Sequence, residues 1–393
     1  MSENLLTFST LELLLAGITG VLFIIQILYY LVTYARPLRA AKTAESTEQA
    51  TVDKEAQPVS VIVYAHGEPE DLRNNLPVLL NQDYPDYEVI VVNDGSDADS
   101  EDILKLFSNE YKNLYYTYVP VDTQYLSHKK LALTMGIKAA RHDILLFTEA
   151  DCRPIGPKWI KAMAGSYNPE TDIILGFCAY RHTKGFLHKL IAYDNLTNGL
   201  QMISSALSHH PFTGNGRNLS YRKKLFFAHK GYARSLNLHA GADDLFINEV
   251  SNPANTQVQL SSDSIIKMNK VGDSETWREI KTSHAATKRF YKGGSLTFYR
   301  METIGYLFFW IAGIATFIVG LSGNCLLSIL AGLLLFLRFT VKALVYKKSA
   351  LLLQQKPLTA WLPLLEIAQP VYDIYIHIYR MFNGKKDFTN NVA

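Results

Sequence analysis

Two acidic segments follow apolar runs in the first half of the chain. Asp94 comes after the run at residues 87–92, and the pair Glu149 and Asp151 comes after the run at residues 144–148. Two carboxylates separated by one residue leave a strand together, and carboxylate oxygens are ligands that Mg²⁺ and Mn²⁺ prefer. A hydrated loop or a helix cap explains the same pattern, and Asp94 alone is typical of a turn. These residues by themselves leave both interpretations open.

Three further segments carry polar groups that a bound ligand would explain. Lys129 begins an expected helix, where its charge opposes the helix dipole unless a phosphate is bound. The stretch Gly-Asn-Gly-Arg-Asn at residues 214–218 has the backbone freedom to approach a sugar ring closely. Asp243 and Asp244 precede an apolar run, where one of them can take a proton from an acceptor hydroxyl. The simpler alternatives are a solvated lysine, a turn and a helix cap.

Alternating strands and helices are expected to position these residues. We predict strands at residues 59–64, 87–92, 115–119 and 144–148, and helices at 69–80, 100–107 and 129–140. This alternation favours a parallel sheet that is covered on both faces. Ligands of such sheets bind beyond the carboxyl ends of the strands, which is where Asp94, Glu149 and Asp151 fall.

Composition excludes several classes of site. The formal net charge of +3 is small, which argues against a dedicated nucleic-acid surface. The three cysteines, Cys152, Cys178 and Cys325, contain no CxxC pair. They therefore predict neither a disulfide framework nor a zinc site, and they fit a reducing compartment.

The N-terminal part of the chain reads as a membrane anchor. Residues 11–33 are almost wholly apolar and long enough to cross roughly 30 Å of hydrocarbon. A cleaved signal peptide would have a basic stretch before its apolar core, and none precedes this one. Arg36, Arg39 and Lys42 follow the run, so we expect the N-terminus outside and the main domain in the cytosol.

A second apolar block, at residues 304–337, is too long for one span and has a turn-like centre at residues 322–324. We predict a helical hairpin, in which Arg338 and Lys342 would have to extend toward the cytosolic surface. Residues 357–382 mix apolar and charged residues with prolines, which favours an interfacial or re-entrant segment over a fourth span. The chain is thus expected to be a multi-pass protein of the cell (inner) membrane.

The segment Val-Ser-Val-Ile-Val at residues 59–63 and the segment Asn-Gln-Asp-Tyr-Pro-Asp-Tyr-Glu-Val-Ile-Val-Val-Asn-Asp-Gly-Ser at residues 81–96 closely resemble the opening of family 2 glycosyltransferases. The resemblance continues through the lysine helix, the acidic strand end, the Gly-Asn-Gly segment and the Asp-Asp pair, and it covers residues 58–289. It implies an α/β, GT-A-like fold, which is a Rossmann-type, mostly parallel sheet with helices on both faces. It also implies inverting transfer from a nucleotide-sugar donor in cell-surface polysaccharide or glycolipid synthesis.

The resemblance also implies a role for each matching residue. Glu149 and Asp151 would hold Mg²⁺ or Mn²⁺. Asp244 would be the catalytic base, with Asp243 beside it in the acceptor region. The positions implied to bind the nucleotide sugar are Ala65, Glu68, Asp94, Lys129, Gly214, Asn215 and Asn218.

The chain departs from the family pattern in three places. His-Gly at residues 66–67 replaces a common Tyr-Asn, and Glu149 replaces the first aspartate of the metal motif. After Trp277, the family's Gln-x-x-Arg-Trp motif or basic Arg-Gln-Lys-Arg run has no clean match. We therefore expect His284, Lys288 or Arg289 to hold the diphosphate instead. This departure favours addition of one or a few sugars. A processive polysaccharide synthase and a non-catalytic scaffold of the same fold are the alternatives.

These inferences divide the chain into five parts. They are a transmembrane anchor at residues 1–35, a linker at 36–57, a cytosolic glycosyltransferase domain at 58–300, a transmembrane hairpin at 301–348, and an interfacial or re-entrant segment with a cytosolic tail at 349–393. The expected partners are a nucleotide-sugar donor, a glycan or lipid-linked acceptor and the membrane, and no nucleic acid.

Overall fold

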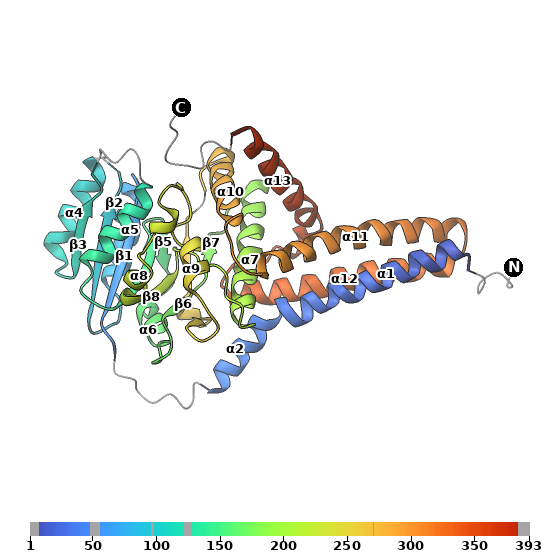
Figure 1. Cartoon of the computed structure of the whole chain (residues 1–393), viewed down its shortest axis with the longest axis horizontal. Helices are drawn as coiled ribbons and strands as arrows, with labels where there is room; N and C mark the ends of the chain where they lie inside the picture. Colours follow the sequence, from blue (N-terminus) through green and yellow to red (C-terminus); the bar gives the residue numbers. More distant parts are fainter. Residues whose placement is uncertain (1–7, 48–55, 96–97, 121–126, 270, 384–393) are drawn as a thin grey trace.

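The computed structural model describes residues 8–47, 56–95, 98–120, 127–269 and 271–383. An α/β domain lies at one end of the molecule, and three long helices extend from it side by side (Figure 1). These helices are α1 (Thr10–Leu28), α11 (Ser295–Ser322) and α12 (Cys325–Leu352).

The main sheet of the α/β domain has seven strands in the order β3-β2-β1-β4-β8-β6-β9. They are β1 (Val59–Ala65), β2 (Tyr87–Asn93), β3 (Leu114–Tyr118), β4 (Ile144–Glu149), β6 (Ile173–Leu175), β8 (Leu219–Arg222) and β9 (Thr256–Val258). The first four strands in this order are parallel, whereas β8 runs antiparallel to β4 and β6. A smaller sheet has the order β5-β10-β7, formed by β5 (Cys152–Pro154), β10 (Ile266–Met268) and β7 (Cys178–Tyr180). The predicted α/β class with a mostly parallel sheet is confirmed.

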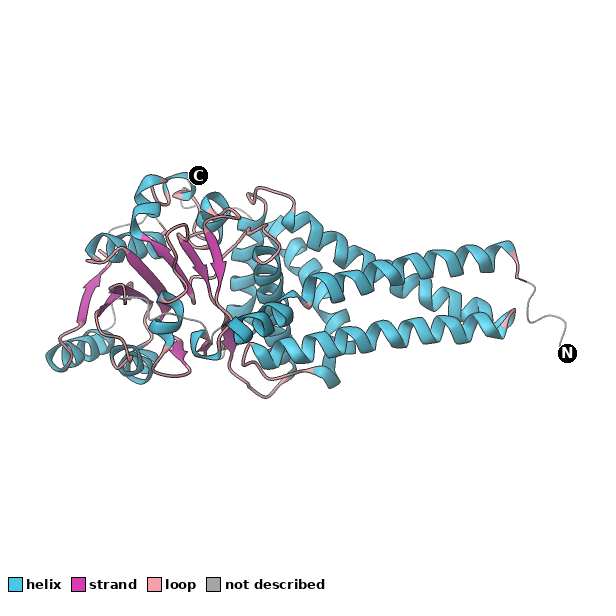
Figure 2. Cartoon of the chain, turned by 90° about the horizontal axis from the view of Figure 1, so that it is seen from below, coloured by secondary structure: helices cyan, strands magenta, loops and turns pink. Residues whose placement is uncertain are grey.

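Helices cover both faces of the main sheet (Figure 2). Val61 and Val63 of β1 belong to a core with Leu72 of α3, whereas Ile62 belongs to the opposite core with Ile137 of α5. Successive side chains of a strand point to opposite faces, so a strand covered on both faces reads as a nearly continuous apolar run. The helices of the domain are α3 (Pro69–Leu80), α4 (Ala98–Glu110), α5 (His128–Ala139), α6 (Trp159–Ala164), α7 (Phe186–Ala206), α8 (Lys223–Ala228), α9 (Asp244–Val250) and α10 (Ser274–Lys288).

The strands and helices expected before residue 150 are all present, within three residues at either end. The expected linker at residues 36–57 is wrong in its first part, because α2 (Arg36–Thr47) is helical. This stretch is rich in alanine, arginine and lysine, which favour helix, and Ala41 is buried against the core. Residues 48–55 of the expected linker lie outside the described residues.

Three helices of the described chain are long and apolar enough to cross a membrane, judged by length and composition. The first continues from α1 through a π-helical segment, η1 (Tyr29–Tyr34), into α2. The predicted hairpin is confirmed, since α11 and α12 meet at Gly323 and Asn324. The Asn324 side chain caps α12, and its backbone N–H donates to Glu12 of α1 at 3.1 Å.

The structure overturns the prediction that Arg338 and Lys342 extend to the cytosolic surface. Their exposed fractions are 0% and 4%, because Glu366 lies between them. The Glu366 Oε1 atom is 2.5 Å from Arg338 Nη1 and 2.6 Å from Lys342 Nζ. Arg338 also donates to Tyr30 of η1 at 2.6 Å. A carboxylate from a later helix thus replaces the water that these cations were expected to seek.

The segment expected to be interfacial forms α13 (Leu362–Asn383), which carries Glu366 and packs against α7 and α10. One row of large apolar side chains on α13 stays exposed: Leu364, Ile367, Val371, Ile374, Ile378 and Met381. Their three- and four-residue spacing places them on one stripe of the helix. The interfacial position of this stripe remains a prediction.

Candidate active site

The carboxyl ends of β1, β2 and β4 bring the expected donor residues to one edge of the sheet. The Asp94 N–H donates to the Ala65 carbonyl at 2.8 Å, and the Ala150 N–H donates to the Tyr64 carbonyl at 2.9 Å. Glu149 ends β4, and Asp151 lies in the tight turn before β5. The parallel register therefore makes neighbours of residues far apart in sequence.

Asp94 is held by three side chains that donate or can donate to it. Its Oδ2 accepts from the Tyr64 hydroxyl at 2.7 Å and lies 3.3 Å from His66 Nδ1. Its Oδ1 lies 2.8 Å from His128 Nδ1. The Asp94 side chain is 2% exposed, whereas that of His66 is 67% exposed and its ring is parallel to that of Tyr64. The site therefore offers an exposed planar ring next to a buried carboxylate.

A chain of alternating charges crosses the same edge. Lys129 Nζ is 2.6 Å from Glu149 Oε1 and 3.2 Å from Asp243 Oδ2. Arg217 Nη2 is 2.6 Å from Glu149 Oε2 and 3.4 Å from Asp151 Oδ2. Lys129 thus links the strand-end carboxylates to the Asp-Asp pair, and Glu149 is paired on both oxygens.

The charges of this network shift the pKa values of its acids in opposite directions. Burial opposes ionisation of Glu149, yet Arg217 and Lys129 lower the pKa of this carboxyl to about 2. Burial, together with the negative charges of Asp151 and Glu149, raises the pKa of Glu68 to about 8. Burial also raises the pKa of Asp243, although Lys129 opposes that shift. Several carboxylates lie near Glu68, and a bound cation would reduce the repulsion between them.

The donor set at Glu149 and Asp151 fits a divalent cation that is completed by a ligand. Among the described residues, no group of three or more His, Cys, Asp or Glu side chains could hold a metal ion. Mg²⁺ in nucleotide sites takes one or two carboxylates and fills its other positions with phosphate oxygens and water, and Mn²⁺ accepts the same oxygen ligands. Asp151 is the less committed of the two, since its Oδ1 accepts from the Cys152 thiol at 3.0 Å and its Oδ2 is 3.4 Å from Arg217, whereas both oxygens of Glu149 lie 2.6 Å from a cation.

Asp244 lies at the first turn of α9 and is oriented by two hydroxyl groups. Its Oδ2 accepts from Thr287 at 2.5 Å and from Tyr291 at 2.9 Å. Asp243 occupies the cap position of α9 but makes no capping hydrogen bond. The helix-cap explanation of the Asp-Asp pair is therefore disfavoured for Asp243.

Lys130, which the sequence analysis did not single out, anchors the loop that leads to this pair. Its buried ammonium donates to the carbonyls of Ser235, Leu238 and Ala240. Ser127 adds a hydrogen bond to the carbonyl of His239 at 2.6 Å. One lysine of the Lys129-Lys130 pair therefore enters the charge network and the other positions the loop. Nothing in the sequence around Lys129 and Lys130 distinguishes the lysine of the charge network from the lysine that positions the loop.

The Gly-Asn-Gly stretch is shaped by close packing. A Cβ on Gly214 would lie 2.9 Å from Ile247, and a Cβ on Gly216 would lie 2.2 Å from Asp243 Oδ2. The Asn215 side chain accepts from the N–H of Arg217 at 3.1 Å, as in a turn. Asn218 is 1% exposed. Its amide accepts from Trp159 and donates to two backbone carbonyls. Asn218 therefore holds the stretch in place and does not face an open site.

The part of the chain that forms this site is similar to a known protein family. Residues 60–227 match the model described as Glycosyl transferase family 2. Over these residues the α/β domain is similar to the family 2 glycosyltransferases.

The curated relatives that match this domain are longer than the matched region. Glycosyltransferase AglE from Haloferax volcanii is 31% identical over 150 residues, which are 37% of this chain and 47% of that protein. A poly-beta-1,6-N-acetyl-D-glucosamine synthase from Staphylococcus epidermidis is 26% identical over 132 residues, 34% of this chain and 30% of that protein. The chain thus spans less than half the length of the curated relatives it matches.

A solved structure shares the fold across nearly the whole chain. The mannosyltransferase PcManGT from Pyrobaculum calidifontis, in complex with GDP-Man and Mn²⁺, aligns with a TM-score of 0.52 at 16% identity. The alignment covers 92% of this chain and 99% of that one. At this identity the likeness shows the fold alone.

Of the three residues expected to hold the diphosphate, His284 lies inside α10, Lys288 ends that helix and Arg289 is its C-cap. Lys281, earlier in the helix, is committed elsewhere, because it is 2.7 Å from Asp194 of α7 and 2.8 Å from Asp373 of α13. Burial and the charge of Lys281 lower the pKa of Lys288. A bound anion would stabilise the charged form of Lys288, whereas Lys281 is already paired with two carboxylates. Lys288 is therefore the better candidate to bind the diphosphate.

The contact between Gly216 and Asp243 predicts a loss of activity in Gly216→Ala. The added methyl group would overlap the Asp243 carboxylate and displace it from Lys129. A displacement of about 1 Å in a site lowers turnover on the order of 100-fold, whereas overpacking costs about 1–3 kcal/mol of stability. Steady-state turnover and thermal unfolding would be measured together, with Gly156→Ala as the control because its Cβ meets no atom within 4 Å. Equal turnover in both variants would contradict the prediction.

Proposed function

We propose that this chain transfers a sugar from a nucleotide-sugar donor to an acceptor hydroxyl with inversion at the anomeric carbon. The observation that carries the proposal is the continuity of the network from Asp151 through Arg217, Glu149 and Lys129 to Asp243, next to Asp244. This continuity supports a diphosphate-binding edge beside Asp244, a carboxylate that accepts hydrogen bonds from two hydroxyl groups. Donor and acceptor groups of a single-displacement reaction need that arrangement.

The donor is proposed to lie along the carboxyl edge of the sheet. Its nucleoside contacts Asp94 and the exposed ring of His66, beside the ends of β1 and β2. Ala65 and Glu68 line the same loop, and the two expected metal ligands follow β4. The mannosyltransferase with the similar fold binds GDP-Man and Mn²⁺, which agrees with this class of donor and cofactor.

Asp244 is proposed to be the base. It takes the proton of the acceptor hydroxyl as that oxygen bonds to the anomeric carbon, while the bond to the nucleoside diphosphate breaks. Thr287 and Tyr291 hold its Oδ2, which leaves Oδ1 for the acceptor. Lys288 and Lys129 stabilise negative charge on the donor side. Mg²⁺ or Mn²⁺, when bound at Asp151 and Glu149, would neutralise charge that develops on the diphosphate.

The acceptor is proposed to be a glycan or lipid-linked sugar that is reached at the membrane. The three long apolar helices are proposed to span the inner membrane, with the glycosyltransferase domain in the cytosol. The exposed apolar stripe of α13 is proposed to lie in the same surface. The similarity to a poly-N-acetylglucosamine synthase keeps a processive reaction as the second candidate, and chain-length analysis of the product separates the two.

Release of nucleoside diphosphate by the detergent-purified chain tests the proposal. A panel of nucleotide sugars would be assayed with Mg²⁺, with Mn²⁺ and with a chelator, in the presence of lipid extract as an acceptor source. We expect release from one donor, and a fall on the order of 100-fold on chelation and in Asp151→Ala. Asp263→Ala removes an exposed aspartate elsewhere in the domain and should leave release unchanged. Release from no donor would favour the scaffold alternative, and full release by Asp151→Ala would refute the metal assignment.

A further inference from the structure

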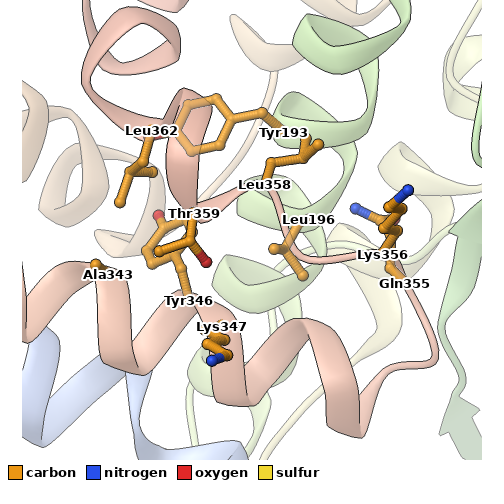
Figure 3. A pocket seen from close by; sticks show the side chains of 10 residues that line it. All are labelled: Tyr193, Leu196, Ala343, Tyr346, Lys347, Gln355, Lys356, Leu358, Thr359 and Leu362. Atoms are coloured by element: carbon orange, nitrogen blue, oxygen red, sulfur yellow. The ribbon is translucent and has the colours of Figure 1, made fainter. Parts of the chain in front are cut away.

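Two shallow clefts lie where α7, α12 and the start of α13 meet, apart from the carboxylate edge of the sheet. The first is open to solvent and is bordered by Tyr193, Tyr346 and Lys356 (Figure 3). The second is bordered by Tyr180, His188 and Lys356. Both are lined by Gln355, Lys356 and Leu358, so one short segment forms the wall between them.

The dividing wall is fixed to the glycosyltransferase domain. Gln355 is 3% exposed. Its Oε1 accepts from Asn195 at 3.0 Å and from the N–H of Tyr180 at 3.1 Å. Its Nε2 donates to the Ala192 carbonyl at 2.7 Å. The neighbouring Lys356 is therefore held at the mouth of both clefts by an anchored backbone.

The clefts are basic. Lys347 and Lys356 line the first, and His182, His188 and Lys189 line the second with Lys356. No acidic side chain is among the described residues that line either cleft. Lys356 Nζ lies 3.0 Å from His182 Nε2, a neutral or cationic partner, in place of a carboxylate. An arrangement of bases without acids attracts an anion.

Aromatic side chains border the basic residues at the end of a proposed membrane span. Lys189 Nζ lies 3.8 Å from the centre of the Trp361 ring. Trp361 is 41% exposed, and the centre of its ring is 6.5 Å from that of Phe186, which is 42% exposed. The segment begins directly after α12, which ends at Leu352. Exposed aromatic rings with lysines at the end of a span are typical of the headgroup layer, and basic pockets there bind lipid phosphates.

We propose that the two clefts form one binding site for a phosphate group, with Lys356 between them and Lys189 and Lys347 on either side. The phosphate is that of a lipid headgroup or a free phosphate, and the two sources share this chemistry. A lipid would place its acyl chains along α12 and the exposed rings. The site lies outside the nucleotide-sugar site, and its occupancy does not require turnover. Failure of this proposal is therefore distinguishable from failure of the proposed transferase activity.

Calorimetric titration of the full chain in detergent tests the site. The probes are dioctanoyl phosphatidylglycerol, dioctanoylglycerol and inorganic phosphate, each at constant ionic strength. K189Q/K356Q removes two lining cations, and K184Q/K348Q removes two exposed lysines that line neither cleft. We expect phosphatidylglycerol to bind about 30-fold more weakly to K189Q/K356Q than to the parent chain, and unchanged to K184Q/K348Q.

The other probes identify the source of the phosphate. Competition by inorganic phosphate supports a site for the phosphate group itself, and binding of phosphatidylglycerol without such competition supports a lipid headgroup. Equal weakening in both double variants would show diffuse charge attraction and would overturn the proposal. Equal affinity in K189Q/K356Q and the parent chain, or binding of dioctanoylglycerol as tight as that of phosphatidylglycerol, would overturn it as well. Unaltered thermal unfolding confirms that each variant is folded.

Discussion

Asp244→Asn is expected to lower sugar transfer by about 10²–10⁴-fold, the contribution typical of a general base. The amide keeps the size of the side chain and its acceptance of hydrogen bonds from Thr287 and Tyr291, but it cannot take a proton. The loss should therefore fall on turnover. Donor binding should stay near that of the parent chain, because the donor residues follow β1, β2 and β4.

Turnover of the preferred donor and, separately, its dissociation constant would be measured. Glu249→Gln is the matched control, since it converts a carboxylate of the same helix that pairs with Arg234 and not with the site. A variant Asp244→Asn with the turnover of Glu249→Gln would remove Asp244 from the role of base. Loss of donor binding together with turnover would instead indicate damage to the loop that Lys130 anchors.

Glu366→Ala is expected to destabilise the chain by about 3–5 kcal/mol, the cost of breaking a buried ion pair by removing one partner. Glu366 is 2% exposed and is the carboxylate in contact with both Arg338 and Lys342. Its removal takes away the carboxylate that contacts both cations, and it leaves Arg338 with Tyr30 and both cations with the more distant buried acid Glu302. Unfolding of the purified chain would be followed in detergent at fixed protein concentration.

A variant that removes all three charges separates pairing from packing. Arg338→Met, Lys342→Met and Glu366→Leu together remove both buried cations and their shared carboxylate, so this triple variant should be more stable than Glu366→Ala. Glu302, which then loses its neighbouring cations, keeps the hydrogen bonds from the Tyr30 and Tyr34 hydroxyls. The expected order is parent and triple variant above the single variant. If Glu366→Ala unfolds like the parent chain, the cluster contributes little to the free energy of unfolding, and water hydrates the two cations in place of Glu366.

Local patterns in the sequence predict most of the α/β domain. The strand at residues 59–64 and the helix at 69–80 are specified by the spacing of apolar residues within each segment. This spacing does not depend on which distant segments pack against them. The ends of those strands also marked Asp94, Glu149 and Asp151, because parallel topology gathers its carboxyl ends at one edge. The hairpin turn at Gly323 followed from its position between two apolar runs.

The expected linker shows where such patterns fail. Residues 36–47 were expected to be a linker, yet they form α2, because the preceding span continues into this helix and Ala41 packs against the core. The role expected of Asn218 differs from its position in the structure for another reason. Its polar side chain was assigned to a sugar pocket, but its amide is satisfied inside the domain by Trp159 and two carbonyls.

The sequence by itself determined the alternation of strands and helices, the three apolar helices and the strand-end acids, because each depends on residues close together in the chain. Only the tertiary structure decided which partners the charged side chains take. Asp244 meets Thr287 and Tyr291, 43 and 47 residues later, and Arg338 meets Tyr30, 308 residues earlier. A buried charge must find a partner wherever packing brings one, and the position of that partner is a property of the folded chain and of no local pattern.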